Sequence, residues 1–259
     1  MESKTLKRAL VTGASEGIGR TFALTLADMG YTVTAVARNE GRLRDLMTGL
    51  TGDKHSWIQA DLTKADELAK VSESLKTEHF DLLVNNAGCG GLGQFQQTPM
   101  QNHRTMIQLN IVALTTLCHD FLSRGQPGDG IINVSSLLSY IPFPPQGVYA
   151  ATKAFVTSLS EALWYEHKNN DLFVMALCPG ATKSEFWERA GGQNKDIPNY
   201  VMQSSEQVVK EAMKHYKKRK KPVLVTGVMN RLSGWFFKFL PTKIIMHLVS
   251  ISTPGYSIK

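Results

Sequence analysis

The chain has 259 residues, of which 42% are apolar, and it carries a formal net charge of +7 at pH 7. This length and composition suffice to bury a large core in one domain, and the sequence contains neither an internal repeat nor a low-complexity linker. The positive charge suits an anionic partner, such as nucleic acid, anionic lipid or a phosphate-bearing cofactor.

Short apolar runs alternate along the chain with longer helical patterns. The runs lie at residues 8–11, 32–37, 56–60, 81–84, 130–134, 172–177 and 222–225. A repeated order of strand and helix predicts a parallel sheet with helices on both faces. We therefore predict an α/β fold with a single domain, built on a doubly wound, parallel, seven-stranded sheet. Residues 191–202 interrupt the alternation, and we expect a loop there at the carboxyl edge of the sheet, where such folds bind ligands.

A glycine-rich turn at residues 12–19 joins the first predicted strand to the first predicted helix. In this context the turn is a dinucleotide-binding fingerprint. Its first glycine allows the tight turn, the second lets a pyrophosphate approach the backbone, and the third lets the helix pack close to the strand. The helix N-terminus then faces the phosphates. We expect cofactor contacts from Gly13, Ser15, Glu16, Gly17, Ile18 and Gly19.

Tyr149 and Lys153 lie four residues apart on a predicted helix that follows Ser136. This spacing puts the phenol and the ammonium group on one helix face. A free phenol titrates near ~10, so acid/base work near pH 7 requires about 4 kcal/mol of charge stabilisation, which the cation can supply. The pair alone is weak evidence, because any amphipathic helix can carry one. Together with the glycine-rich turn, it predicts an enzyme.

The ordered set of motifs resembles the short-chain dehydrogenase/reductase family, and the resemblance covers nearly the whole chain through Val225. It implies a Rossmann fold and hydride transfer between a nicotinamide cofactor and a carbonyl or alcohol. The matching features are the Thr-Gly-x-x-x-Gly-x-Gly turn, Asn85-Asn86-Ala87-Gly88 after the fourth strand, Asn110 in the next helix, Ser136 after the fifth strand, Tyr149 with Lys153, and Pro179-Gly180 after the sixth strand.

The resemblance also implies roles for the catalytic residues. In carbonyl reduction, Tyr149 donates its proton to the developing alkoxide while the Ser136 hydroxyl holds the same oxygen. Lys153 lowers the pKa of the tyrosine and binds the nicotinamide ribose, and Asn110 helps to hold a water that passes protons to the lysine. The alternative for Asn110 is a polar side chain in mid-helix that faces solvent. Ser135 is the less suitable serine, because the family spacing to Tyr149 selects Ser136.

Arg38, which follows the second predicted strand, indicates the choice of cofactor. An acidic residue there would bind the adenosine 2′-hydroxyl, whereas arginine offers a planar fork of donors to a 2′-phosphate. We therefore expect NADP(H) to be favoured over NAD(H). Glu16 departs from this pattern, because many NADP-dependent relatives have a basic residue at its position. Its carboxylate would repel the 2′-phosphate unless it points away or pairs with Arg38.

The resemblance implies further cofactor contacts along the chain. Asp61 and Leu62 match the position that meets the adenine, although Asp61-Leu62-Thr63 is equally a strand end followed by a helix cap. Ser184 matches a hydroxyl near the nicotinamide carboxamide. The remaining expected contacts are Asn86, Ala87, Gly88, Tyr149, Lys153, Pro179, Gly180 and Thr182.

The chain after residue 226 differs in character from the rest. We expect residues 1–226 to form the catalytic, NADP-binding domain and residues 227–259 to form an amphipathic C-terminal extension that belongs to the same domain or covers its pocket. Large apolar residues recur at helical spacing on both sides of Pro241, which together with charged residues interrupts any stretch long enough to span a membrane. The helical set before the proline is Leu232, Trp235, Phe236, Phe239 and Leu240.

Three roles remain open for this extension. It covers the substrate pocket, forms a dimer contact, or lies on an anionic membrane with the five consecutive cations of residues 217–221 beside it. The simplest role for those cations is a solvated helix end that offsets the helix dipole.

The sequence thus predicts an NADPH-dependent reductase that converts a hydrophobic ketone or 3-oxoacyl compound to a secondary alcohol. One alternative is a hydroxysteroid- or lipid-type alcohol dehydrogenase that works oxidatively, and another is a non-catalytic NADP-binding regulator. We expect a homodimer or homotetramer, no nucleic-acid partner, and peripheral membrane contact through residues 217–251 as an option.

The N-terminal residues lack a secretory signal, so we expect a cytoplasmic protein. The cysteines are three in number and widely spaced, without a Cys-x-x-Cys pair or a histidine cluster, so we expect small buried residues and no metal site (Cys89, Cys118, Cys178).

Overall fold

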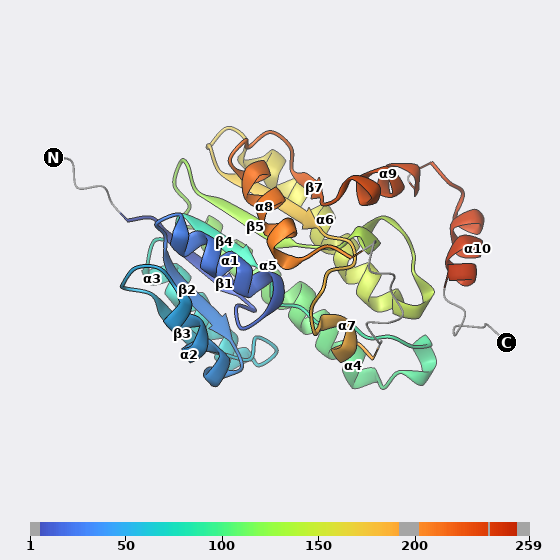
Figure 1. Ribbon diagram of the computed structural model, residues 1–259, viewed down its shortest axis with the longest axis horizontal. Helices are drawn as coiled ribbons and strands as arrows, with labels where there is room; N and C mark the ends of the chain where they lie inside the picture. Colours follow the sequence, from blue (N-terminus) through green and yellow to red (C-terminus); the bar gives the residue numbers. More distant parts are fainter. Residues whose placement is uncertain (1–5, 192–201, 238, 253–259) are drawn as a thin grey trace.

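A computed structural model describes residues 6–191, 202–237 and 239–252, with the backbone alone at residues 235 and 250–252. Its seven strands form one sheet in the order β3-β2-β1-β4-β5-β6-β7, and every pair of neighbours is parallel (Figure 1). The strand order reverses between β1 and β4. The strands are β1 (Arg8–Thr12), β2 (Thr32–Ala37), β3 (Ser56–Gln59), β4 (Leu82–Asn85), β5 (Gly130–Val134), β6 (Phe173–Cys178) and β7 (Val223–Val225).

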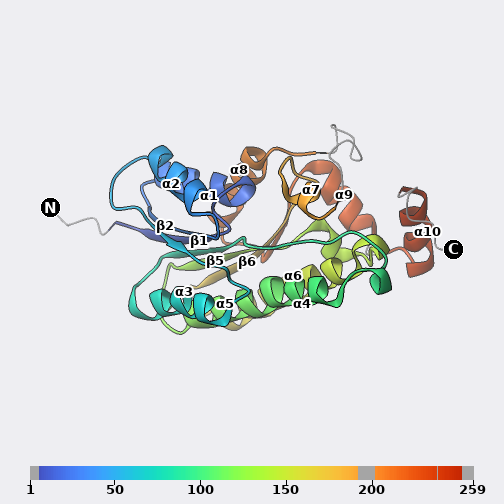
Figure 2. The ribbon, with the colours of Figure 1, turned by 90° about the horizontal axis from the view of Figure 1, so that it is seen from below.

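Helices cover both faces of the sheet, as Figure 2 shows, because the strand side chains alternate between two apolar cores. In β1, Ala9 and Val11 face one core and Leu10 faces the other. The first core is closed by α1 (Gly17–Asp28), α2 (Glu40–Gly49) and α8 (Ser205–Tyr216), and the second by α3 (Ala65–Thr77), α5 (Leu114–Leu122) and α6 (Gly147–His167).

This architecture confirms the predicted doubly wound parallel sheet. Each strand begins and ends within one or two residues of its apolar run. Ser204 and Gln207 form the capping box that starts α8. Thr63 is not a helix cap, because α3 has Lys64 at that position. Most of the predicted loop 191–202 lies outside the described residues.

The longest apolar helical stretch within the described residues is Met100–Leu122, which is long and apolar enough to cross a membrane by length and composition alone. It consists of α4 (Met100–Ile107), the π-helical turn η2 (Gln108–Ala113) and α5. It packs against α3 and α6, and 44% of its apolar window is buried inside the protein. Its apolar side chains therefore serve the second core.

The C-terminal extension forms α9 (Val228–Phe237) and α10 (Thr242–Ser252) beyond β7 (Figure 1). A third apolar cluster joins α10 to the segment between β5 and α6, which contains the short helices η3 (Leu137–Tyr140) and η4 (Pro144–Gln146). Ile245 and Val249 of α10 pack there with Ile141. The extension thus contacts the segment that leads to Tyr149. The other short helices are η1 (Phe95–Gln97) and α7 (Phe186–Arg189).

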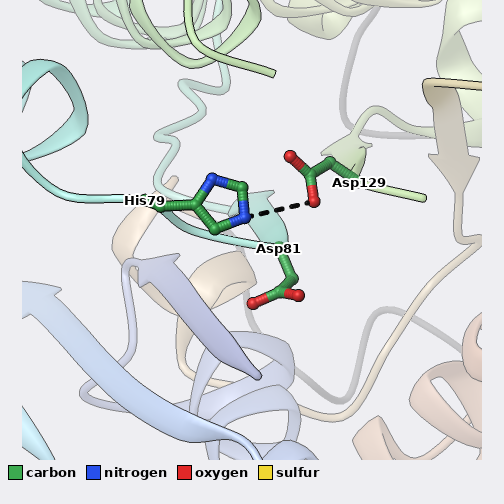
Figure 3. Close-up of side chains that lie close together, drawn as sticks. All are labelled: His79, Asp81 and Asp129. Atoms are coloured by element: carbon green, nitrogen blue, oxygen red, sulfur yellow. Dashed lines mark ion pairs between the residues drawn. The ribbon is translucent and has the colours of Figure 1, made fainter. Parts of the chain in front are cut away.

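An acidic cluster lies where β4 and β5 begin, at the edge opposite to the sequence motifs (Figure 3). His79 Nε2 is 3.5 Å from Asp129 Oδ1, and Asp81 lies beside them. Asp81 Oδ2 accepts a hydrogen bond from the backbone N–H of Arg8, and Asp129 Oδ2 accepts one from that of Gln126, each at 2.7 Å. The two carboxylates therefore hold the backbone in place by hydrogen bonds, Asp81 at the start of β1 and Asp129 just before β5.

Candidate active site

The glycine-rich turn between β1 and α1 is held in a shape that only glycine fits. Gly13 and Gly17 have φ angles of +64° and +51°, in the left-handed region. A Cβ atom at Gly13 would lie 2.8 Å from Asn86 Nδ2, and one at Gly19 would overlap the carbonyl oxygen of Gly13. The turn and the helix start are therefore packed directly against the end of β4.

Hydrogen bonds tie this turn to the Asn86–Gly88 segment. The Thr12 hydroxyl oxygen accepts from the backbone N–H groups of Asn86 and Ala87, each at 3.0 Å. In return, Asn86 Nδ2 donates to the carbonyl oxygens of Thr12 and Gly13 at 3.0 and 3.1 Å. These bonds cross the point where the strand order reverses, which is where open α/β sheets bind ligands.

The start of α1 fits the phosphates of a dinucleotide. Glu16 is its N-cap residue, but the side chain makes no hydrogen bond to the helix, so the first-turn N–H groups have no side-chain acceptor from the cap. Gly13, before the helix, and Gly17, its first residue, carry no Cβ that would block a ligand. An uncapped helix N-terminus at this edge is a suitable site for an anion. Ile18 packs against the first core, which leaves its backbone for such a contact.

Ser136, Tyr149 and Lys153 meet at the carboxyl end of β5. Ser136 follows the strand, and the other two residues lie on the first turns of α6. A side-chain hydrogen bond joins Ser136 to Tyr149, and Lys153 Nζ lies 5.7 Å from the centroid of the tyrosine ring. Lys153 Nζ also donates to the carbonyl oxygen of Val134 at 2.8 Å. All three candidate side chains are less than a tenth exposed.

Burial dominates the protonation of this group. It raises the pKa of Tyr149, an effect that the hydrogen bond with Ser136 partly opposes. It lowers the pKa of Lys153 to about 8. The spacing of the two residues predicts a lowered pKa for the Tyr149 phenol, and this prediction is wrong. The pKa is raised instead, because desolvation of the phenolate outweighs the other effects on the phenol. Tyr149 thus keeps its proton at neutral pH.

Asn110 joins the same site from the π-helical turn η2. Its Nδ2 donates to the carbonyl oxygen of Cys89 at 2.9 Å and to the Thr152 hydroxyl at 3.0 Å, while its Oδ1 accepts from the Cys89 N–H at 3.0 Å. A Cβ at Gly88 would lie 3.2 Å from Asn110 Oδ1 and 3.4 Å from Lys153 Nζ. Asn110 is 1% exposed, so the alternative of a solvent-facing side chain is wrong.

Ser135 has a structural role beside Ser136. Its hydroxyl donates to the carbonyl oxygen of Lys153 at 2.8 Å and lies 2.7 Å from the Thr157 hydroxyl. It therefore holds β5 to the helix α6 that carries the tyrosine and the lysine. This arrangement agrees with the choice of Ser136 as the candidate catalytic serine.

Arg38 and Asp61 lie together at the carboxyl ends of β2 and β3. Arg38 is 68% exposed, and its Nη1 lies 4.0 Å from Asp61 Oδ2. Burial acts to raise the pKa of Asp61. Hydrogen bonds from Thr63 and the charge of Arg38 nevertheless hold this pKa below its usual value. Leu62 is buried in the second core. Glu16 does not pair with Arg38; its partners are Arg42 and Arg189.

The segment after β6 closes the site from the other side. Gly180 packs so tightly against Asn230 of α9 that a Cβ would overlap the amide. The Thr182 hydroxyl donates to the carbonyl oxygen of Gly180 at 3.1 Å. A Cβ at Gly17 would be 3.4 Å from the Cβ of Ser184, so Ser184 faces the glycine-rich turn. The expected cofactor contacts at Pro179–Ser184 and in the turn therefore line one edge of the sheet.

The site contains one aromatic contact that the motifs do not predict. The ring of Phe186, on α7, lies 5.6 Å from that of Tyr149, centroid to centroid. A Cβ at Gly90 would be 3.1 Å from Phe186 Cζ. Helix α7 is four residues long, so it has no apolar periodicity that could have marked it in the sequence.

Known proteins are similar to this chain in sequence and fold. A family model described as short chain dehydrogenase matches residues 7–195. The 7beta-hydroxysteroid dehydrogenase of Mediterraneibacter gnavus is 28% identical over 231 residues, which cover 86% of this chain and 87% of that protein.

Two solved structures resemble this one over nearly its whole length. A short-chain dehydrogenase from Sphingobium yanoikuyae in complex with NADPH is 31% identical, with a TM-score of 0.77 and coverage of 95% of this chain and 96% of that one. The bulky-bulky ketone specific alcohol dehydrogenase from Comamonas testosteroni is 29% identical, with a TM-score of 0.76 and 95% coverage of each chain.

Proposed function

This chain belongs to the short-chain dehydrogenase/reductase family, whose members are oxidoreductases of alcohol and carbonyl groups, and we propose that it is an NADPH-dependent carbonyl reductase. It reduces a hydrophobic ketone or a 3-oxoacyl compound to a secondary alcohol. The observation that carries this proposal is the buried, hydrogen-bonded pair of Ser136 and Tyr149 with Lys153 beside it.

The chemistry requires that a carbonyl oxygen gain a proton as its carbon gains hydride, which NADPH supplies when bound. Tyr149 holds its proton at neutral pH, so it is ready to donate. The Ser136 hydroxyl, already bonded to the phenol, orients a carbonyl oxygen toward the same proton. Lys153 replaces the lost proton through its own ammonium group, and Asn110 helps to hold a water that passes a proton back to the lysine.

The raised pKa of Tyr149 keeps the phenol in the protonated form that carbonyl reduction uses. Reduction uses the protonated phenol, whereas alcohol oxidation needs the phenolate, which burial disfavours. A hydroxysteroid- or lipid-type alcohol dehydrogenase that works oxidatively is the second candidate, supported by the name of the Mediterraneibacter gnavus relative. A non-catalytic NADP-binding regulator would have no need of the buried Ser136, Tyr149 and Lys153 together.

The residues around the glycine-rich turn would hold the cofactor. The uncapped start of α1 suits the pyrophosphate, and the exposed guanidinium of Arg38 suits a 2′-phosphate. NADPH in the Sphingobium yanoikuyae structure supports this preference. Asp61 and Leu62 would lie at the adenine, and Lys153 would bind the ribose of the nicotinamide. Ser184, which faces the turn, would meet the carboxamide.

The pocket is expected to take a lipophilic substrate. Residues 137–145 precede Tyr149 and contribute Leu138, Ile141 and Phe143 to the apolar cluster with α10. We propose that residues 1–226 form the catalytic domain and that the 227–259 extension covers its pocket through this cluster. The related enzyme from Comamonas testosteroni is named for bulky ketones, which is consistent with a large apolar site.

We also propose a homodimer or homotetramer located in the cytoplasm. Two packed helical segments leave large apolar side chains exposed that a second copy could cover: Ile107 and Val112 on the α4–η2 segment, and Phe155 on α6. The three cysteines are free, as suits a reducing compartment. Peripheral membrane contact through residues 217–251 is part of the same proposal.

The test compares Tyr149→Phe and Ser136→Ala with Ser135→Ala. Tyr149→Phe removes the proton donor and little volume, so turnover of the best ketone should fall more than a thousandfold while the Kd for NADPH stays within about threefold. Ser136→Ala should lose about a hundredfold in kcat. Ser135→Ala is the matched control: it removes structural hydrogen bonds, so it should lower the free energy of unfolding by about 1 kcal/mol and keep its turnover. A Tyr149→Phe protein with a tenth of wild-type activity would refute the assignment.

A further inference from the structure

Glu16 belongs to a four-residue ion cluster that spans three elements. Its carboxylate pairs with Arg42 of α2 and with Arg189 of α7. Arg42 Nη1 and Nη2 also donate to Glu185, beside α7, at 3.1 and 3.2 Å. We name Glu16, Arg42, Glu185 and Arg189 the turn cluster. It contains two carboxylates and two guanidinium groups, so its net charge is zero.

Because of the position of Glu16, the neutrality of the turn cluster matters for binding of a phosphate. The residue caps α1, where the structure offers backbone N–H groups to an anion. A lone carboxylate there would repel a phosphate, and the repulsion between two like charges grows where protein replaces part of the surrounding water. The Glu16 side chain is 24% exposed, which limits its screening by solvent.

The turn cluster is separate from the other candidate phosphate ligand. Arg38 lies 4.0 Å from Asp61, at the ends of β2 and β3, and is 68% exposed. Arg42 lies four residues later, on α2, and is 41% exposed. Arg38 can therefore attract a 2′-phosphate directly, while the charge of Glu16 is cancelled by guanidinium groups that come from α2 and α7.

We propose that the turn cluster is a determinant of cofactor specificity. Arg42 and Arg189 cancel the charge of Glu16, and this cancellation allows the chain to accept NADPH although it has an acidic residue in its glycine-rich turn. Arg42 and Arg189 are positioning residues in this scheme, because they act through Glu16. The inference deepens the proposed function, on which it rests for the identity of the cofactor.

The experiment varies the charge of the cluster and measures binding without turnover. Kd values for NADPH and NADH are measured by titration calorimetry in 50 mM and 500 mM NaCl. Arg42→Gln gives the cluster a charge of −1 and should raise the Kd for NADPH about tenfold in low salt, with a smaller change for NADH, which lacks the 2′-phosphate. Glu16→Gln gives +1 and should lower the Kd for NADPH about threefold. The double variant restores zero and should return within about twofold of the wild type.

Two further variants separate this effect from a general one. Arg189→Gln should resemble Arg42→Gln, because it produces the same cluster charge from another element. Arg44→Gln, also on α2, is the matched control: Arg44 is 65% exposed, pairs with Glu40, and should leave both Kd values unchanged.

The results separate failure of this inference from failure of the proposed function. If Glu16→Gln fails to restore NADPH binding to the Arg42→Gln protein, Arg42 acts by direct contact and the cancellation scheme is wrong. Equal shifts for NADPH and NADH would also overturn it. If the wild-type protein itself binds NADH more tightly than NADPH, the proposed cofactor preference fails, whatever the variants do.

Discussion

At the scale of single residues, the burial of Lys153 destabilises the folded protein. The lysine is 4% exposed, and burial lowers its pKa to about 8. Its hydrogen bond to the carbonyl oxygen of Val134 offsets only part of this cost. The site therefore holds a cation where folding alone would favour a neutral group, as functional sites often do.

Replacing Lys153 with methionine should stabilise the protein at pH 7. The pKa in the folded protein, about 8, lies below the ordinary value of 10.5, so the unfolded chain binds the proton more tightly. The buried ammonium costs roughly 3 kcal/mol below pH 8, and losing the bond to Val134 costs about 1 kcal/mol. We expect Lys153→Met to raise the free energy of unfolding by about 2 kcal/mol at pH 7.

This advantage should vanish as the pH rises from 8 to 10.5, because the wild-type lysine then becomes neutral in both states. Urea denaturation of both proteins across pH 7–10 measures the difference. Lys168→Met, which replaces an exposed lysine at the end of α6, provides the control and should not show the same trend. A pH-independent difference between the Lys153→Met protein and the wild type would contradict the argument.

The candidate site of Ser136, Tyr149 and Lys153 could be located from the sequence, and the turn cluster could not. Ser136, Tyr149 and Lys153 stand at fixed spacings beside a glycine-rich turn, and that conjunction carries the information. Arg42 and Arg189 have no such spacing to Glu16, and lone arginines normally indicate only a solvated surface. Their pairing follows from the fold, which brings α2 and α7 to the start of α1.

At the scale of elements, apolar patterning was sufficient for the sheet and insufficient for short helices. All seven strands carry apolar side chains into the cores, so each left a run in the sequence. Helix α7 and the π-helical turn η2 left none, although Phe186 and Asn110 on them contact the site. An irregular turn has no period to detect, and Asn110 was identified only through the family resemblance.

Loosening the contact between α10 and residues 138–143 should weaken the binding of large substrates more than that of small ones. Ile245 and Val249 are buried against Ile141, so Ile245→Ala/Val249→Ala should loosen α10 from residues 138–143. We expect the KM for a long lipophilic ketone to rise about tenfold, with small ketones changed less than twofold, since the latter need little of the pocket wall. Steady-state kinetics with a graded series of ketones measures this.

Leu248→Ala supplies the control for that variant. Leu248 lies on the same helix and is 44% exposed, so its truncation should leave both KM values unchanged. If the double variant affected long and short ketones equally, α10 would not belong to the pocket wall, and its packing would be purely structural.

At the scale of the whole molecule, the net charge of +7 is not all available to a partner. Arg219, within the basic run 217–221, donates to the carbonyl oxygens of Gly128, Asp129 and Asp171 at 2.7–2.9 Å. Arg231 on α9 pairs with Glu211 at 2.9 Å. The exposed lysines of the run remain available to a partner. One of them, Lys221, lines a groove of about 420 Å³ together with Gly234 of α9.

We expect this arrangement to bind an anionic membrane. Met229, Leu232 and Phe236 lie at helical spacing on α9 and are 77%, 60% and 55% exposed. We expect the protein to co-sediment with phosphatidylserine-containing vesicles in 50 mM NaCl and to be released in 500 mM NaCl. Leu232→Ser/Phe236→Ser should reduce the bound fraction at least fivefold without affecting NADPH binding.

Phosphatidylcholine vesicles serve as the uncharged control for this assay. If the protein ignored both kinds of vesicle and its mass in solution rose with concentration, the apolar face of α9 would be a contact between copies of the chain. Binding to both vesicle types without salt dependence would show that the lysines contribute nothing.

The hydrogen bonds between Thr12 and Asn86 have a consequence for the order in which the protein matures. They join residues 74 positions apart, so the dinucleotide edge needs β4 in place before the glycine-rich turn acquires its final shape. Closing so long a segment is slow compared with forming a helix. During synthesis the N-terminal strands and helices therefore leave the ribosome well before they can hold a nucleotide. We therefore expect the chain to bind a dinucleotide only after β4 has joined the sheet.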